Sequence, residues 1–271
     1  MDTDRTLEDL MKDMRINDTS LRTNTSVTSL DTHASITLPE GIPRQTLEFL
    51  MKEWAKSQNL KWGTSTAAYI AKIGRLDLLK LARYLGCEWD SWTSVAAAEN
   101  GHLELLKWAH SQGCSLENFS ICSSAAIRGH LEVLQWARSK GCAWDELTCT
   151  WAAGEGHFEM LKWARENGCN WSADTSARAA EYGQLEILKW LLSNGCRVDW
   201  RVCAWSAMNG HLDVLIWARK NNCPWDTCTC KFAIQNGHLK VLKWAISHGC
   251  PWDQETEKLA KQVWPCEFSK I

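Results

Sequence analysis

Cysteine and histidine are the residues of this sequence with the most capacity for chemistry, since both bind metals and both serve in catalysis. The 271 residues include 13 cysteines and 8 histidines. Cys223, Cys228 and Cys230 form the one local cluster, with the spacing C-x4-C-x-C. No histidine follows this cluster at a spacing typical of zinc sites. We therefore expect no metal and no cofactor.

The other cysteines and histidines recur at regular intervals, which argues against catalysis. Five histidines each directly follow a glycine: His102, His130, His157, His211 and His238. Seven cysteines follow a glycine or an asparagine, and four more each precede a glycine by seven residues. An active site needs one copy of a residue, whereas a repeated packing position needs many. We predict that the histidines hydrogen-bond the turns at helix starts, that the cysteines are small core residues, and that the protein is not an enzyme.

These residues belong to a repeat that runs through most of the chain. Its units are marked by seven glycines at intervals of 27, 28, 27, 27, 27 and 27 residues: Gly74, Gly101, Gly129, Gly156, Gly183, Gly210 and Gly237. After most of these glycines, leucine, tryptophan and alanine follow at helical spacing, and an Ala-rich segment precedes the glycine; the copy that starts at Gly74 is diverged. Each unit therefore predicts two short helices. Because one unit cannot bury its apolar face alone, the units must stack as an α-solenoid.

Short turns separate the predicted helices. Six units end at Gly-Cys, and glycine suits the left-handed residue that closes many helices. A Trp-Asp pair often follows, as at Trp144-Asp145, and the aspartate is well placed to cap the next helix. Another tryptophan recurs on the second helix, at Trp108, Trp136, Trp163, Trp190, Trp217 and Trp244. We expect this ladder to be buried between units and to hold them together.

The units resemble a known repeat family. The run Ala-Ala-x-x-Gly-His-Leu-Glu-Val-Leu-Lys, followed by Gly-Cys twelve residues after the first glycine, resembles the ankyrin repeat over roughly residues 64–253. An ankyrin unit usually has about 33 residues, whereas this unit has 27. The missing residues are those of the β-hairpin finger. The resemblance implies an all-α fold, an ankyrin-like α-solenoid of stacked helix-turn-helix repeats that lacks β-hairpins.

The repeats divide the chain into four expected segments. We predict a disordered polar tail over residues 1–37, an N-terminal capping half-repeat over 38–62, seven repeats over 63–253, and a C-terminal capping helix and tail over 254–271. Residues 38–50 also resemble the opening of an F-box. That second resemblance implies an alternative function, a substrate-recognition adaptor for ubiquitin ligation.

Binding residues are expected where the units differ while the repeat is kept. In ankyrin repeats, the position five residues before the glycine lies on the concave side of the first helix and commonly contacts the target. Aromatic residues, methionine and arginine, which are enriched at interface centres, occur at and near this position. The candidate partner-binding residues are Tyr69, Ile127, Trp151, Arg178, Tyr182, Trp205, Met208 and Phe232. The alternative is that the two tryptophans pack against neighbouring helices.

Composition narrows the class of partner. A net charge of −2 and a pI near 6.4 give no basis for binding nucleic acid. No run of 18 apolar residues predicts a membrane span, and the charged N-terminus does not resemble a secretory signal. We therefore expect a monomeric, non-catalytic scaffold in the cytoplasm or the nucleus that binds a protein partner through its concave first-helix face.

Overall fold

The computed structural model describes residues 43–118 and 120–268, and all the regular structure in these ranges is helical. The helices form two compact units, one ending at Asn118 and the other beginning at Phe119. The first unit contains α2 (Arg44–Ser57), α3 (Thr64–Lys72), α4 (Leu76–Tyr84), α5 (Ser91–Glu99) and α6 (Leu103–Ser111). The predicted tail, residues 1–37, lies outside the described residues, as do residues 38–42.

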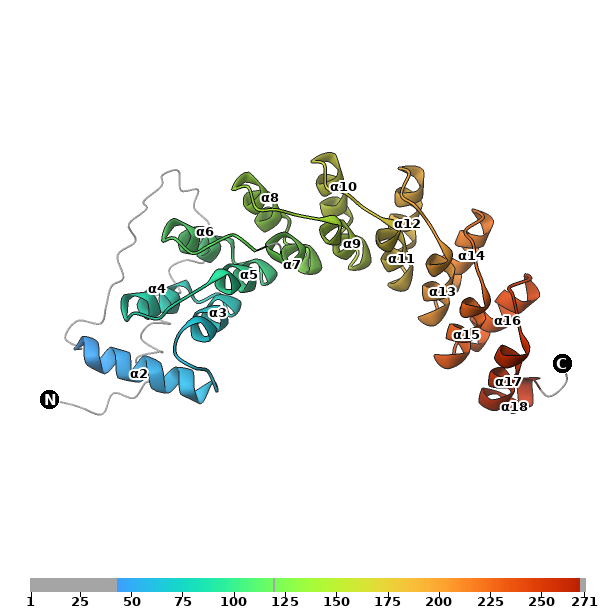
Figure 1. The fold of residues 1–271 in the computed structure, drawn as a ribbon, viewed down its shortest axis with the longest axis horizontal. Coiled ribbons are helices and arrows are strands. Elements are labelled where there is room, and N and C mark those ends of the chain that lie inside the picture. The colour runs from blue at the N-terminus through green and yellow to red at the C-terminus, as the bar shows by residue number, and fades with distance from the viewer. Residues whose placement is uncertain (1–42, 119, 269–271) are drawn as a thin grey trace, which may run out of the picture. The chain divides into compact units, whose positions relative to one another are not determined.

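The second unit continues the same pattern of paired helices (Figure 1). Its helices are α7 (Ser120–Arg128), α8 (Leu131–Ser139), α9 (Glu146–Gly154), α10 (Phe158–Glu166), α11 (Ala173–Glu181), α12 (Leu185–Ser193), α13 (Trp200–Met208), α14 (Leu212–Lys220), α15 (Thr227–Gln235), α16 (Leu239–Ser247), α17 (Gln254–Val263) and α18 (Pro265–Phe268). Odd-numbered helices from α7 to α15 are the first helices of their repeats, and even-numbered helices from α8 to α16 are the second. The predicted all-α solenoid without β-hairpins is confirmed.

Local signals set the ends of these helices. The carboxylate of Asp145 accepts a hydrogen bond of 3.0 Å from the backbone N–H of Leu147, and other capping aspartates do the same. At the other end of the pair, Gly168 has φ of +84°, in the left-handed region. Asn222 occupies the equivalent position with φ of +60°. The predicted caps therefore explain why each unit is a pair of nine-residue helices.

Cysteine is a core residue of the repeat, as predicted. Eleven of the 13 cysteines are buried, whereas Cys228 is half-buried and Cys266 is exposed. The thiol of Cys169 donates a hydrogen bond of 3.2 Å to the carbonyl oxygen of Asp145, the residue that caps the first helix of the same pair. The same bond recurs at Cys114, Cys196 and Cys250. It ties the end of the second helix to the start of the first.

The recurring histidines connect neighbouring repeats. Nε2 of His211 donates a hydrogen bond of 3.0 Å to the carbonyl oxygen of Glu181, thirty residues earlier, at the end of α11. The imidazole also lies so close to Gly183 that a Cβ atom there would be 2.8 Å from the ring. A packing role was predicted, but the bond crosses to the preceding repeat instead of closing the local turn.

The tryptophan ladder lies between repeats as expected, but its rings are half-buried and therefore more accessible than predicted. The guanidinium of Arg165, near the end of α10, lies 4.3 Å from the ring centre of Trp171 in the following link. The Trp171 ring packs edge-on against Trp190 of the next second helix, with ring centres 5.6 Å apart. Arg165 Nη1 also donates to the carbonyl oxygen of Cys169. We call this Arg–Trp–Trp arrangement the arginine stack.

The arginine stack recurs in three other repeats. Its members there are Arg83, Trp89 and Trp108; Arg138, Trp144 and Trp163; and Arg219, Trp225 and Trp244. In one repeat both residues are replaced, by Leu192 and Val198, whereas in the last repeat Ile246 replaces the arginine and the linker tryptophan, Trp252, is kept. A layer that is one helix pair thick cannot cover a large ring on both faces, so the tryptophan rings stay partly in contact with solvent at the boundary between repeats. The arginine packs over the accessible ring and is held there by cation–π attraction.

Both ends of the repeat array carry partial units. In α2, Leu47, Met51, Trp54 and Ala55 are buried. The predicted C-terminal helix is α17, and it is followed by α18, a single turn that was not predicted. Phe268 of α18 is buried and stacks on Trp252, with ring centres 6.1 Å apart. No helix in the described part of the chain has the length and apolar character needed to cross a bilayer.

Candidate functional site

The first helices of the second unit present a continuous row of variable side chains. Helices α9, α11, α13 and α15 pack in sequence order, and they line the inner side of the arc that this unit forms in Figure 1. The row five residues before each glycine consists of Trp151, Arg178, Trp205 and Phe232, and all four are half-buried. We call this row and its neighbours on the same helices the first-helix face. Its tryptophans therefore both pack and remain partly accessible.

Arg178 is the centre of an aromatic cluster on this face. Its guanidinium carbon lies 4.9 Å from the ring centre of Trp151, on α9. The same atom lies 5.9 Å from the ring centres of both Trp205, on α13, and Tyr182, which follows α11. Three of the predicted binding residues therefore surround a fourth. A guanidinium over aromatic faces is stabilised by cation–π attraction.

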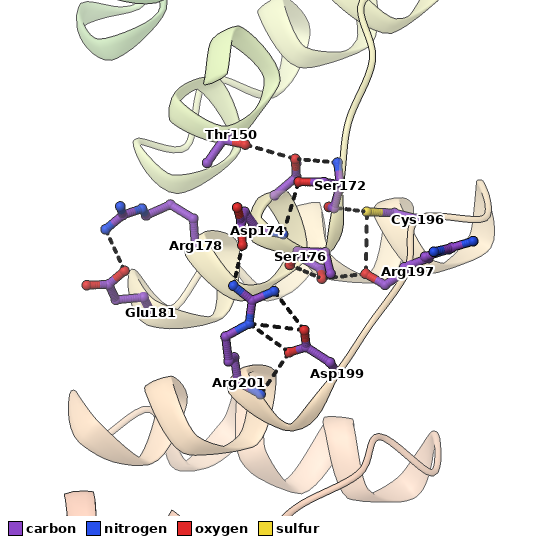
Figure 2. Close-up of polar contacts among 12 residues, drawn as sticks. Thr150, Ser172, Asp174, Ser176, Arg178, Glu181, Cys196, Arg197, Asp199 and Arg201 are labelled. Atoms are coloured by element: carbon purple, nitrogen blue, oxygen red, sulfur yellow. Dashed lines mark hydrogen bonds and ion pairs between the residues drawn. The ribbon is translucent and has the colours of Figure 1, made fainter. Parts of the chain in front are cut away.

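One carboxylate holds the guanidinium in this position. Nη1 of Arg178 donates to Oε2 of Glu181 at 2.7 Å, and their side chains are 28% and 20% exposed (Figure 2). The two residues are one helical turn apart on α11, so the pair forms within a single helix. Nε of Arg178 is buried and has no hydrogen-bond partner among the described residues. Glu181 was not among the predicted residues, although its spacing of three residues from Arg178 was a usable signal.

Gly154 makes room for Arg178. It ends α9, and a Cβ atom there would lie 2.5 Å from Cγ of Arg178. Glycine inside a helix costs about 1 kcal/mol relative to alanine, and the contact with Arg178 accounts for its presence. Gly154 was not predicted from the sequence, because its contact joins two repeats and has no local signature.

A second arginine supports Trp205. Arg201, in the first turn of α13, lies with its guanidinium carbon 5.6 Å from the Trp205 ring centre. Its side chain donates to Asp199, the capping residue of α13, at 2.7 Å, and it also donates to Asp174 of α11 (Figure 2). The network joins two adjacent first helices and restricts the position of Trp205.

These contacts lower the pKa of Asp199. Burial by itself would raise the pKa of this carboxyl, but hydrogen bonds from the side chain and backbone of Arg201 lower it overall. The side-chain bond to Asp199, together with the one to Asp174, raises the pKa of Arg201. Both groups therefore stay charged at neutral pH, and Arg201 is already matched by two carboxylates.

The remaining predicted residues have different surroundings. Met208 on α13, Ile127 on α7 and Phe232 on α15 are half-buried along the first-helix face, and Tyr182 is 43% exposed. Tyr69 lies in the first unit, where it packs against Trp54 with ring centres 6.1 Å apart and donates to Gln58. It therefore contacts the N-terminal cap and does not belong to the Arg178 cluster.

Two exposed apolar residues at the starts of first helices were also missed. Leu147, in the first turn of α9, is 47% exposed, and Trp200, in the first turn of α13, is 38% exposed. Their position just after a capping aspartate was the signal that could have identified them. Leu147 lies one helical turn before Trp151 and therefore widens the apolar part of the first-helix face.

The described residues provide no competing site for catalysis by a metal. No group of three histidine, cysteine, aspartate or glutamate side chains in residues 43–118 and 120–268 is arranged to hold a metal ion. Within the predicted cysteine cluster, Cys223 and Cys230 are buried core residues while Cys228 is half-buried. The segment with the F-box resemblance is described only from residue 43 onward, so the adaptor function stays a prediction.

Comparison with known proteins identifies the fold. No protein-family profile and no curated protein sequence matches this chain. Among solved structures, it resembles the human ASB11 ankyrin repeat domain with a TM-score of 0.53, over 69% of this chain and 99% of that one. The chain has an ankyrin-like repeat fold. The identity is 16%, so the likeness is one of fold, and the ankyrin-like units here are shorter, with 27 residues and no strand in the described part.

Proposed function

We propose that this ankyrin-like protein is a non-catalytic scaffold that binds a protein partner through the first-helix face of its second unit. The observation that carries the proposal is the half-exposed cluster of Arg178 between Trp151 and Trp205. Tryptophan, tyrosine and arginine are the residue types that dominate binding energy at the centres of protein interfaces. Here they gather on one face from three different repeats.

The cluster is also ordered before any partner arrives. The cation–π contacts, the bond to Glu181 and the Arg201 network restrict the side chains that a partner would cover. A preordered surface loses less side-chain entropy on binding than a flexible one. The half-buried rings therefore retain accessible apolar area whose burial would favour association.

The buried cysteines favour a particular cellular compartment. We place the scaffold, as a monomer, in the cytoplasm or the nucleus, because a reducing compartment keeps the eleven buried thiols reduced. The repeat itself supplies the rigid support, since the cysteines, histidines and arginine stacks are used in packing. We assign recognition to the variable residues of the first-helix face, which the repeated packing contacts do not require.

The proposal is tested by affinity purification with mass spectrometry. The bait proteins are the wild-type chain, the double variant Trp151→Ala with Trp205→Ala, and a control, Phe49→Ala with Trp92→Ala. The control removes two aromatic side chains that are 62% and 59% exposed in the first unit. We expect the double variant to lose partners that the control retains, with far-UV circular dichroism unchanged. Retention of all partners by the folded double variant would show that the site is assigned wrongly.

A further inference from the structure

The first-helix face carries a specific chemical preference that rests on the proposed function. We infer that Arg178 recognises an acidic side chain, placed between apolar residues in a segment of the partner protein. The inference concerns what the face binds, and it depends on the donors that Arg178 leaves unused, the rings around it and the charges nearby.

Arg178 uses few of its donors within the chain. A guanidinium has five N–H donors, and Arg178 makes one hydrogen bond to Glu181 through Nη1. Nε is buried, so the exposed part of the guanidinium is its Nη edge. A carboxylate at this edge would complete a second charge-assisted bond without moving the side chain.

The rings around Arg178 favour such a contact. Trp151 and Trp205 flank the guanidinium and lower the local dielectric, which strengthens an ion pair formed there. The same rings, with the exposed Leu147, offer apolar surface on either side of the cation. Apolar residues beside the partner's acid would cover this surface. The face therefore fits an acidic residue with apolar neighbours better than it fits a run of acidic residues.

The nearby carboxylates make a basic partner residue the weaker candidate. Asp174 and Asp199 both bind Arg201, and Glu181 binds Arg178. The space among the three rings is already filled by the Arg178 guanidinium. A partner lysine or arginine would have to displace Arg178 from both its carboxylate and its rings. An acid needs no such displacement.

The two possibilities predict opposite effects for Glu181→Gln. If an acidic residue binds Arg178, removing the adjacent negative charge lowers the repulsion of the incoming carboxylate and tightens binding. If Glu181 instead receives a basic residue, the same change weakens binding. The variant keeps the length and hydrogen-bonding capacity of the side chain, so helix α11 is expected to remain intact.

The experiment uses a displayed library of random twelve-residue peptides, selected on the full chain and on the Trp151→Ala, Trp205→Ala double variant. Peptides that require the tryptophans are synthesised with and without an acid-to-amide change. We expect these peptides to contain Asp or Glu beside apolar residues. We expect the amide change to weaken binding about tenfold to a hundredfold, and Arg178→Met to weaken it by the same factor. Combining the two changes should cost no more than either alone, and Glu181→Gln should tighten binding.

The outcomes separate this inference from the proposed function. Selected peptides that need the tryptophans but bind equally well to Arg178→Met, or that weaken with Glu181→Gln, would overturn the acidic preference and leave the binding face intact. Peptides that bind the tryptophan double variant as well as wild type, or the absence of any selected peptide, would overturn both. Thermal unfolding of each variant confirms that the compared proteins are folded.

Discussion

At the scale of single residues, Gly154 and Arg178 act as a pair although they are 24 positions apart. Replacing Gly154 by alanine should raise helix stability by about 1 kcal/mol in an Arg178→Ala background. In the wild-type background the new Cβ would lie 2.5 Å from Arg178 Cγ, which is closer than van der Waals contact allows, so the gain should be lost or reversed. Urea unfolding of the four proteins measures this coupling. Equal effects in both backgrounds would contradict the assigned contact.

Buried thiols give the protein a characteristic response to alkaline pH. Burial raises the pKa of Cys122 and of Cys203 to about 12, from an ordinary value of 9.0. In the unfolded chain these thiols ionise near pH 9, so their contribution to stability is complete below that pH. It should be lost as the pH rises from about 9 towards 12.

This response is measured as the free energy of unfolding between pH 7 and pH 11. Replacing Cys122 and Cys203 by alanine should lower stability at pH 7 but flatten its decline above pH 9.

In native alkylation, the exposed Cys266 should react while the eleven buried cysteines stay protected. Rapid alkylation of buried cysteines without unfolding would contradict their role as core residues.

At the scale of elements, the arginine stack joins neighbouring repeats at four places in the chain. Arg165→Leu with Trp171→Val would reproduce the pair that Leu192 and Val198 form elsewhere in the chain. We expect Trp171→Val alone to cost roughly 2–3 kcal/mol of stability, because the ring is half-buried. The two changes should be coupled by about 1 kcal/mol. Strict additivity in a double-mutant cycle would show that the stack contributes little.

The helix pairs could be predicted from sequence because their signals are local. Asp145 caps α9 and Gly168 closes α10, and each acts within a few residues of the element it ends. Arg165 and Gly154 were missed because their partners lie across a turn or in the next repeat. The tryptophan ladder was predicted to be buried between units because the size of the ring favours burial, whereas a single layer of helix pairs leaves one side of each ring partly open.

The candidate site was partly predictable for a related reason. Variation within a constant repeat pointed to Trp151, Arg178 and Trp205 as candidates, since the repeat does not fix the residue type at these positions. Their grouping around one guanidinium depends on contacts between repeats, and the sequence has no short-range pattern for these. Tyr69 shares the repeat position but lies beside the N-terminal cap, where the helix preceding it supplies Trp54 as a neighbour.

At the scale of the whole molecule, we propose that most of the residues that hold the repeats together differ from those that recognise the partner. The repeated cysteines, histidines and arginine stacks hold the helix pairs together, and the residues that vary gather on the first-helix face of the second unit. This division predicts that changes on that face weaken binding by more than they lower the free energy of unfolding, since the half-buried rings there also pack between helices. It also predicts that changes in the arginine stack lower stability first and binding only as a consequence.

The most direct test of the central claim is site-specific photo-crosslinking in the presence of a partner recovered by affinity purification. A benzoylphenylalanine is placed at Tyr182 on the first-helix face or at Tyr84 at the end of α4, two tyrosines that are 43% and 44% exposed. We predict a crosslink to the partner from position 182 and none from position 84. Crosslinking from position 84 with none from position 182 would contradict binding through the first-helix face.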